Sequence, residues 1–386
     1  MRLLSEIQAN SNKLKEIETP AYIYSPELVD QNYLSLKECL GTKLIVSIKA
    51  NSNVDLLNLS SVEKDGYEAT SLEELSIITQ LRPKEKFINN PSMDAELVRK
   101  SVFSGTTVII DNLNQVSFFY EIAGEKEISV MLRVNGKDLS QYYQQDYRMK
   151  GDYFGLSVMD IKEALVQLKE MGVKVVGLHL FNGSHSFTKH AVDFAKFIKK
   201  LTLECEVQLD YKLESINFGG GFSRDWHQSG FDFEGYRGLL SELYSDYELY
   251  HESGRAIFET SGIYLTRVIS TKKLADKNIV ICDGGLAHNF LLAQTESTFK
   301  KYRQPSLIVS DTKKISPVES TLIGSSCNKD DVVGTLPSGE KTLVGGDIVI
   351  FDSCGAYAQT YSPVNFLSLK QAKSYIWSIS KGNSIE

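Results

Sequence analysis

Three short segments carry side chains that could bind a carbonyl compound and an anion. Lys49 follows the apolar run KLIVSI, three glycines occupy Gly219–Gly221, and a carboxylate and a guanidinium lie close together in Glu252–Arg255. A lysine with a lowered pKa can form a Schiff base, and glycine N–H groups can approach an anion closely. Each segment also has a plain structural interpretation: a solvated charge, a tight turn and a local ion pair.

Strand-like apolar runs alternate with segments of helical spacing through the first two thirds of the chain. The runs lie at 43–49, 66–70, 86–90, 106–111, 128–135, 173–181, 215–221 and 248–255. Strands separated by crossover helices pair in parallel. Eight such units predict an α/β fold, a (β/α)8 TIM-like barrel, for which ~250 residues is typical. An open doubly wound sheet is the alternative.

The predicted barrel brings the three segments to one end. Lys49 ends the first strand, the glycine run ends the seventh, and Glu252–Arg255 ends the eighth. Barrel enzymes keep their chemistry at this end and often bind phosphate after strands seven and eight. Pyridoxal 5′-phosphate needs a lysine for its aldehyde, N–H groups and an arginine for its phosphate, and an acid, here Glu252, for its ring nitrogen. The residues therefore predict a site for this cofactor.

The pattern changes after about residue 257. Strand-like runs such as KNIVICDGG and GGDIVIFDS follow one another with few helical periods between them, which predicts a β-rich domain, an antiparallel barrel or sandwich. The early run AYIYS (21–25) is expected to pair with this later sheet. We therefore expect a cofactor-binding barrel over 26–256 and a β domain made of 1–25 and 257–386.

Composition places the chain among soluble globular proteins. It has 386 residues, 42% hydrophobic and 24% charged, with a net charge of −7. An acidic chain without long Lys/Arg runs is a poor candidate for binding nucleic acid or an anionic membrane, and no apolar stretch approaches the ~20 residues of a membrane span. Five scattered cysteines argue against a disulfide framework. A cytoplasmic location with reduced thiols is expected, and no metal site is predicted.

Nine motifs, in order, resemble those of the fold-type III pyridoxal-phosphate-dependent decarboxylases, the family of the ornithine and diaminopimelate decarboxylases. The resemblance extends from Thr19 to about Leu369. The motifs are SIKAN around Lys49, GYEATSLEEL (66–75), LRVN (132–135), GLHLFNGS (177–184), INFGGGF (216–222), ESGR (252–255), CDGG (282–285), GSSCNKDD (324–331) and GAYAQTYSPVNFLS (355–368).

The resemblance implies a role for each matching residue. Lys49 would bind the cofactor aldehyde, and Cys327 would protonate the α-carbon across the interface of a homodimer, the β domain of one subunit completing the site of the other. Arg133 and Asn328 would contact substrate. The remaining cofactor-binding residues would be His179, Phe181, Ser184, Gly219, Gly220, Gly221, Glu252, Gly254, Arg255 and Tyr357.

Three departures from the family pattern bear on the substrate. Phe181 stands where relatives often have histidine, Leu291-Leu292 stand where diaminopimelate decarboxylases carry an Arg-Pro pair, and neutral Asn328 follows the cysteine where an acid would hold a distal ammonium. Phe181 can stack on the cofactor but cannot hydrogen-bond to it, and the other two changes argue against free diaminopimelate, lysine or ornithine. They resemble a subgroup that acts on conjugated substrates: the L-glutamyl-[acyl-carrier protein] decarboxylase type of butirosin biosynthesis and siderophore-cluster decarboxylases.

The expected reaction is therefore α-decarboxylation of an amino acid in conjugated or carrier-bound form. An acyl carrier protein, if it is a partner, would need a basic patch, for which Lys300-Lys301-Tyr302-Arg303 is the candidate and a solvated charge run the alternative. The other functions considered are a decarboxylase of a free amino acid, an amino-acid racemase and a non-catalytic pyridoxal-phosphate-binding protein. Retention of both Lys49 and Cys327 favours decarboxylation.

Overall fold

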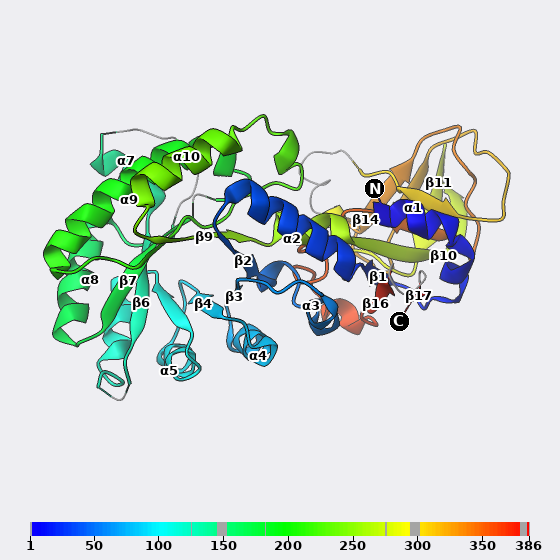
Figure 1. The fold of residues 1–386 in the computed structure, drawn as a ribbon. Coiled ribbons are helices and arrows are strands. Elements are labelled where there is room, and N and C mark those ends of the chain that lie inside the picture. The colour runs from blue at the N-terminus through cyan, green and yellow to red at the C-terminus, as the bar shows by residue number, and fades with distance from the viewer. Residues whose placement is uncertain are drawn as a thin grey trace. The chain divides into compact units, whose positions relative to one another are not determined.

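A computed structural model describes residues 2–124, 126–144, 153–181, 183–274, 276–293, 302–378 and 384–385. The chain divides into two compact units, both visible in Figure 1. The barrel unit comprises residues 33–52 and 62–256, and the β unit comprises residues 1–32, 53–61 and 257–386.

Eight parallel strands close into a barrel within the described part of the barrel unit, which confirms the predicted TIM-like fold. Neighbours along the chain are also neighbours in the barrel, and the last strand pairs with the first. The strands are β2 (Lys43–Ser47), β3 (Gly66–Ala69), β4 (Glu85–Asn89), β5 (Thr107–Ile110), β6 (Ser129–Val134), β7 (Lys174–Leu180), β8 (Ser215–Asn217) and β9 (Glu248–Ser253).

The helices that connect these strands lie around the barrel in Figure 1, with α8, α9 and α10 along one side. Most begin at a side chain that accepts a hydrogen bond from the first turn, such as Ser71, Asp94, Ser157 and Asp232. The helices of this region are α2 (Pro26–Leu40), α4 (Leu72–Leu81), α5 (Ala95–Phe103), α6 (Leu113–Val116), α7 (Gly136–Tyr142), α8 (Val158–Glu170), α9 (Phe187–Leu209), α10 (Phe233–Tyr244) and α11 (Arg255–Phe258).

A layer of apolar side chains fills the barrel interior, one from each of six strands. Because successive side chains of a strand point to opposite faces, alternate residues of each strand can meet inside the barrel. The layer consists of Ile45, Phe87, Ile109, Met131, Val176 and Tyr250. A packed interior leaves the strand ends and their loops to carry polar side chains.

The β unit is built on a nine-stranded sheet within its described residues. Its long strand β10 (Gly262–Leu274) pairs with β1 (Ala21–Tyr24), so the early run joins the later sheet as predicted. Two pairs are parallel, β1 with β16 and β11 with β13, whereas the prediction had antiparallel hairpins alone. The other strands are β11 (Lys277–Cys282), β12 (Leu307–Val309), β13 (Ser320–Ile323), β14 (Val332–Leu336), β15 (Ile348–Phe351), β16 (Lys373–Ser378) and β17 (Ser384–Ile385).

The N-terminal segment packs against this sheet. Leu3 and Ile7 of α1 (Arg2–Ala9) belong to one buried cluster with Ile23 of β1, Ile263 of β10 and Trp377 of β16. A shorter helix, α3 (Val54–Leu59), also belongs to the β unit. The unit is therefore assembled from chain segments far apart in the sequence.

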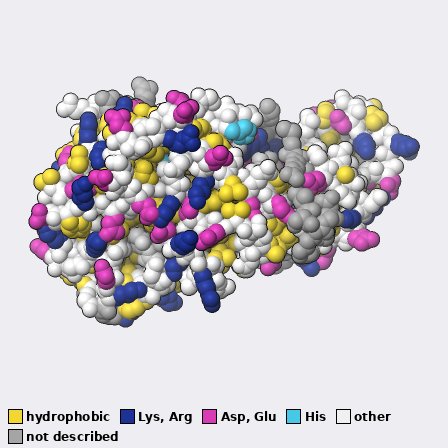
Figure 2. Space-filling model, in the orientation of Figure 1, with side chains coloured by type: hydrophobic (Ala, Val, Ile, Leu, Met, Phe, Trp, Pro, Cys, Tyr) yellow, Lys and Arg dark blue, Asp and Glu magenta, His cyan; other side chains and the backbone are white. Residues whose placement is uncertain are grey.

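Charges of both signs mix on the face of the barrel unit drawn in Figure 2, as expected for an overall charge of −7 from many residues of each sign. None of the described helices has the length and hydropathy needed to cross a membrane.

Candidate active site

Lys49 lies beside a buried carboxylate. Strand β2 ends at Ser47, two residues earlier than the sequence predicted, and Lys49 occupies the 3-10 turn Ile48–Ala50 rather than the strand itself. Its Nζ is 3.2 and 3.4 Å from the two carboxylate oxygens of Glu68, which is 1% exposed. Ser47 pairs with Glu68 in the β2–β3 register and donates its hydroxyl to that carboxylate at 2.7 Å. The amine is thus held by a short network of neighbouring strands.

Glu252 is a second buried carboxylate, on β9. Its Oε1 accepts a hydrogen bond from Asn217 Nδ2 at 2.8 Å and lies 3.4 Å from Nε2 of the fully buried His179. Burial raises the pKa of Glu252, but His179, Lys49 and the Asn217 hydrogen bond together outweigh burial and lower it below its ordinary value. Glu252 therefore stays negatively charged inside the barrel, where it can stabilise a positive group.

Two of the three glycines after β8 need a backbone that other residues rarely adopt. Gly219 and Gly221 have φ of +61° and +99°, in the left-handed region. An added Cβ would lie 2.1 Å from the carbonyl oxygen of Leu180 at Gly219 and 2.6 Å from that of Gly183 at Gly221. The loop after β8 is therefore packed tightly against the loop after β7.

Close backbone packing at Gly220 and Gly254 brings the end of β9 near the glycine run after β8 and near the turn that carries Lys49. A Cβ at Gly220 would lie 2.5 Å from the carbonyl oxygen of Glu252, and one at Gly254 would lie 2.5 Å from Ala50 Cβ. Arg255 begins α11 directly after Gly254. The segments that carry Lys49, the glycine run and Glu252–Arg255 thus meet at one end of the barrel, with Gly254 packed against the turn that carries Lys49.

Arg133 is buried on β6 and is paired with one acid of the barrel. Its Nη1 donates to Asp111 at 2.9 Å and to Asn89 at 3.4 Å, and its guanidinium carbon lies 4.8 Å from the ring centroid of Phe154. Its Nε has no hydrogen-bond partner among the described residues. Because Asp111 already neutralises this charge, contact with a substrate carboxylate stays a prediction.

Two further predicted residues lie in the loop after β7. Phe181 is half-buried and its Cα lies 3.2 Å from the Cβ position of Gly219, whereas Ser184 is exposed. Ser186, which the sequence analysis did not select, donates its hydroxyl to Gly183 at 2.6 Å and shapes this loop.

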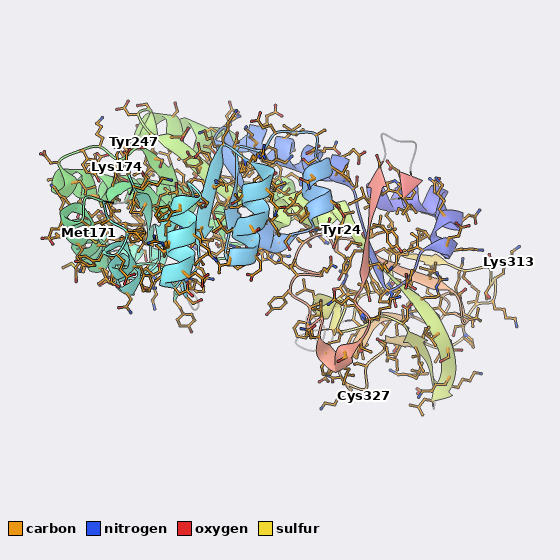
Figure 3. The ribbon with its side chains drawn as sticks, turned by 90° about the horizontal axis from the view of Figure 1, so that it is seen from below. Tyr24, Met171, Lys174, Tyr247, Lys313 and Cys327 are labelled. Atoms are coloured by element: carbon orange, nitrogen blue, oxygen red, sulfur yellow. The ribbon has the colours of Figure 1, made fainter. Side chains whose placement is uncertain are left out.

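The remaining predicted residues belong to the β unit. Cys327 is exposed, and Figure 3 shows it at the periphery of that unit, whereas Cys205, Cys282 and Cys354 are buried. The side-chain oxygen of Asn328 accepts a hydrogen bond from the Asp330 backbone at 2.9 Å. Tyr357 adopts a left-handed φ of +62°.

The predicted basic patch is only partly described. Lys300 and Lys301 lie outside the described residues, while Arg303 donates to the side chain of Asp352 at 3.1 Å and to its carbonyl at 3.0 Å. The Arg303 charge is therefore engaged within the β unit, which weakens this segment as a docking patch.

Glu68, Asn217 and Asp111 are site residues that the sequence analysis missed. Each is a polar residue inside or at the end of a buried strand-like run, and that position is the signal that could have revealed them. Their partners lie on neighbouring strands: Glu68 accepts from Ser47 of β2, Asn217 donates to Glu252 of β9, and Asp111 accepts from Arg133 of β6. The sequence alone does not give that pairing.

Comparison with known proteins agrees with this geometry. The family described as "Pyridoxal-dependent decarboxylase, pyridoxal binding domain" matches residues 27–266. The crystal structure of a Helicobacter pylori diaminopimelate decarboxylase mutant complexed with L-lysine superposes with a TM-score of 0.79 at 20% identity, covering 98% of this chain and 95% of that one. At that identity the superposition shows the fold.

Three curated relatives each match most of the chain. A diaminopimelate decarboxylase from Archaeoglobus fulgidus is 27% identical, covering 89% of this chain and 84% of its own. The L-glutamyl-[BtrI acyl-carrier protein] decarboxylase of Niallia circulans is 25% identical (92% and 87%). The 2-[(L-alanin-3-ylcarbamoyl)methyl]-2-hydroxybutanedioate decarboxylase of Staphylococcus aureus is 26% identical (84% and 85%).

The residues of the barrel fit pyridoxal 5′-phosphate. The cofactor needs a primary amine, backbone N–H groups open to an anion, and an acid for its pyridine nitrogen. Lys49 supplies the amine. The backbone of Gly219–Gly221 lies so close to neighbouring backbone that side chains would not fit there. Glu252 has a pKa lowered enough to remain anionic. The chain therefore belongs to the pyridoxal-dependent decarboxylase family and is an amino-acid decarboxylase that uses pyridoxal 5′-phosphate.

Proposed function

We propose that this decarboxylase removes the α-carboxylate of an amino acid whose far end is conjugated, to a carrier protein or to another small acid. The single observation that carries the substrate class is the absence of charge where relatives hold a distal ionic group: Leu291-Leu292 and Asn328. Leu292 is buried and Leu291 half-buried in the β unit. In a conjugate the amide or thioester link takes up the amino acid's own distal ammonium or carboxylate, so a charged residue at these positions has no such group to pair with.

In the proposed mechanism the amine of Lys49 would hold the cofactor through its aldehyde. The bound pyridoxal ring supplies an electron sink for the bond to the departing carbon dioxide. Glu68 holds the Lys49 amine near the end of β2, and its hydrogen bond from Ser47 keeps the carboxylate in place. Glu252 keeps the pyridine nitrogen protonated because its carboxylate stays charged in the buried site.

The phosphate of the cofactor is assigned to the loops after β8 and β9. Backbone N–H groups of Gly220, Gly221 and Gly254 and the guanidinium of Arg255 offer neutral and charged donors at a common end of the barrel. The N–H of Gly219 already donates to Asn217 Oδ1 at 2.8 Å, so Gly219 shapes the loop rather than donating to the phosphate. Ser184 completes the proposed set in the barrel unit, with His179 and Phe181 beside the ring, and a phosphate contact by Tyr357 stays a prediction from the resemblance.

Cys327 is proposed to return a proton to the α-carbon after carbon dioxide leaves. In this proposal the thiol acts across a homodimer interface, each subunit completing the other's site, which makes the dimer necessary for turnover. The exposed position of Cys327 in the single chain is compatible with a role at an interface.

Two relatives support the conjugated substrate over a free one. One is named for a glutamyl group on an acyl-carrier protein and another for an alanine joined through a carbamoylmethyl group to a hydroxybutanedioate. The diaminopimelate decarboxylases match at similar identity, so the choice rests on the uncharged residues named above.

The first experiment records the visible spectrum of the purified protein with the cofactor, reduces it with borohydride and maps the adduct by peptide mass. The adduct is expected on Lys49. Carbon dioxide release is then measured with free diaminopimelate, lysine, ornithine and glutamate beside the same amino acids as amide conjugates and as thioesters of a carrier protein.

We expect release from a conjugate to exceed release from the free amino acid by at least about 100-fold in kcat/KM, which corresponds to about 2.7 kcal/mol. Faster turnover of any free amino acid would contradict the conjugate proposal. A Cys327→Ser variant is expected to retain the Lys49 adduct and to lose about 10²-fold or more in amine formation, as for loss of a general acid.

A further inference from the structure

One buried carboxylate joins two loops of the β unit. Asp331 is 2% exposed. Its Oδ1 accepts a hydrogen bond from the backbone N–H of Leu286 at 2.6 Å. Its Oδ2 accepts two from Ser326, one from the backbone N–H at 3.0 Å and one from the hydroxyl at 2.5 Å. Hydrogen bonds to a charged acceptor are stronger than neutral ones, so this side chain is the main polar link between the loops.

The packing around this carboxylate admits only glycine at two positions. A Cβ added to Gly285 would lie 2.4 Å from Asp331 Oδ1, and one added to Gly324 would lie 2.3 Å from the same oxygen. A Cβ at Gly324 would also lie 2.5 Å from the Cα of Gly285. Neither glycine has a left-handed φ, so space, not backbone conformation, excludes a side chain. The two loops touch at the point where Asp331 joins them.

Each loop leads directly to residues that the proposed function uses. Ser326 immediately precedes Cys327, and the Ser326 hydroxyl also accepts a hydrogen bond from the Asn328 N–H at 3.3 Å. On the other loop the N–H of Gly285 donates to His288 Nδ1 at 3.1 Å, and the chain continues to Leu291-Leu292. Asp331 therefore lies between the proposed proton donor and the segment that the substrate's far end is proposed to contact.

We propose that Asp331 is a positioning residue that sets the Cys327 loop against the Gly285–Leu292 segment, so that proton delivery and recognition of the substrate's far end depend on one buried link. The roles of Cys327 and Leu291-Leu292 rest on the proposed function, whereas the link itself is testable without turnover. Removing the charge weakens three hydrogen bonds at once. An amide in its place can accept from one loop, but its NH2 group would face the donors of the other.

The test compares Asp331→Asn with Asp330→Asn in the cofactor-loaded protein. The two substitutions are chemically identical and adjacent, but Asp330 is exposed. Amide hydrogen exchange is followed by mass spectrometry in peptides covering 284–292 and 324–328, and the alkylation rate of Cys327 by iodoacetamide is measured between pH 6 and 9.

We expect Asp331→Asn to speed exchange at least tenfold in both peptides and to change the alkylation rate of Cys327 at least threefold. We expect β10 and β15 to exchange as before, and Asp330→Asn to stay within twofold throughout. A change in only one of the two loops, or a uniform rise over the β unit, would overturn the link, since the latter describes a residue that only stabilises the fold.

If Asp331→Asn yields no folded protein, Ser326→Ala decides, because it removes one donor and leaves the carboxylate. Exchange at 284–288 is then expected to rise about threefold although the substitution lies in the other loop. Unchanged exchange there would refute the link.

Failure of the link and failure of the proposed function give different results. Absence of a borohydride adduct on Lys49 in the unsubstituted protein refutes the function and leaves the exchange data intact. With an active substrate, Asp331→Asn is expected to alter kcat and also the discrimination between free and conjugated forms, whereas Cys327→Ser alters kcat alone.

Discussion

The barrel unit and the β unit each bury a carboxylate, and the partners of the two differ. Glu252 in the barrel faces a histidine and the charge of Lys49 in addition to an amide, and its pKa is lowered as a result. Asp331 in the β unit is held by two backbone N–H groups and one hydroxyl. The first arrangement controls the charge of a site, and the second controls where two loops lie.

The difference between the two carboxylates indicates that the two units contribute differently to the proposed reaction. At the ends of neighbouring strands the barrel holds an amine, a glycine-rich backbone and an anionic acid, and these are the groups that bind the cofactor. The β unit holds an exposed thiol and an uncharged segment, whose proposed action on a substrate requires accurate placement. Changes in the barrel should therefore remove cofactor binding, and changes in the β unit should alter the fate and choice of substrate.

The largest effect is expected from Lys49→Ala. Without the amine no adduct can be trapped by borohydride, and carbon dioxide release should fall at least about 10³-fold. The control is Lys84→Ala, which removes a 76% exposed lysine of the same unit paired with Glu63 and should change neither measurement. An adduct that persists on another lysine of the Lys49→Ala variant would show that the barrel site is wrongly assigned.

The next effect is expected from Gly219→Ala. The added Cβ would meet the Leu180 carbonyl at 2.1 Å on a backbone with φ of +61°, so the loop must move and cofactor affinity should fall about 100-fold. Fluorescence titration with pyridoxal phosphate measures this change.

Gly238→Ala is the matched control, because Gly238 is exposed within α10 and nothing lies within 4 Å of its Cβ position. It should bind cofactor normally and gain about 0.5–1 kcal/mol in the free energy of unfolding. Equal loss of affinity in both variants would mean that the loss does not come from the glycine run, and unchanged affinity in Gly219→Ala would mean that the run acts only as a turn.

The barrel and part of its site can be predicted from the sequence alone, whereas contacts set by the fold cannot. The barrel is predictable because strands and helices alternate regularly, and strand-end positions then place Lys49 and Glu252 at one end. Glu68 and Asn217 escape prediction because their partners are fixed by strand register. Asp330 and Asp331 are adjacent and chemically alike in the sequence, and only the fold shows that the second is buried between glycines.

The mixed pairing of the β unit has a similar cause. Strands β1 and β16 are separated by hundreds of residues, and their parallel pairing follows from packing against β10 and the N-terminal helix, not from any local pattern. Local signals such as turn residues favour hairpins, so the sequence predicted antiparallel neighbours alone.

A smaller effect is expected from pH. The pKa of Glu252 is lowered in the folded protein, so its contribution to stability is present above the ordinary glutamate pKa of ~4.3 and is lost as pH falls toward the lowered value. Urea unfolding of the cofactor-free protein between pH 5.5 and 3.5 should show stability falling with acid. Glu252→Gln should lose on the order of 1 kcal/mol of that dependence.

The control for the pH experiment is Glu242→Gln, an exposed glutamate of α10 in the same unit. It should retain the pH dependence of the unsubstituted protein. If Glu252→Gln also retains it, the carboxylate is not held in its charged form by its neighbours, and its proposed role toward the pyridine nitrogen loses its electrostatic basis.

The smallest effect is expected in the β unit from Asn328→Asp, which places a charge beside Cys327. The substituted side chain can still accept the Asp330 N–H hydrogen bond that Asn328 Oδ1 accepts at 2.9 Å, so the loop should keep its conformation. A half-exposed charge interacts weakly through water. We therefore expect only a threefold to tenfold gain in kcat/KM for substrates with a free distal ammonium relative to neutral conjugates.

Cofactor affinity should be unchanged in Asn328→Asp, because the substitution adds no group to the barrel. Competition between one free and one conjugated substrate in the same assay measures the ratio directly. A change in cofactor affinity without a change in that ratio would contradict the assignment of cofactor binding to the barrel unit and of substrate choice to the β unit.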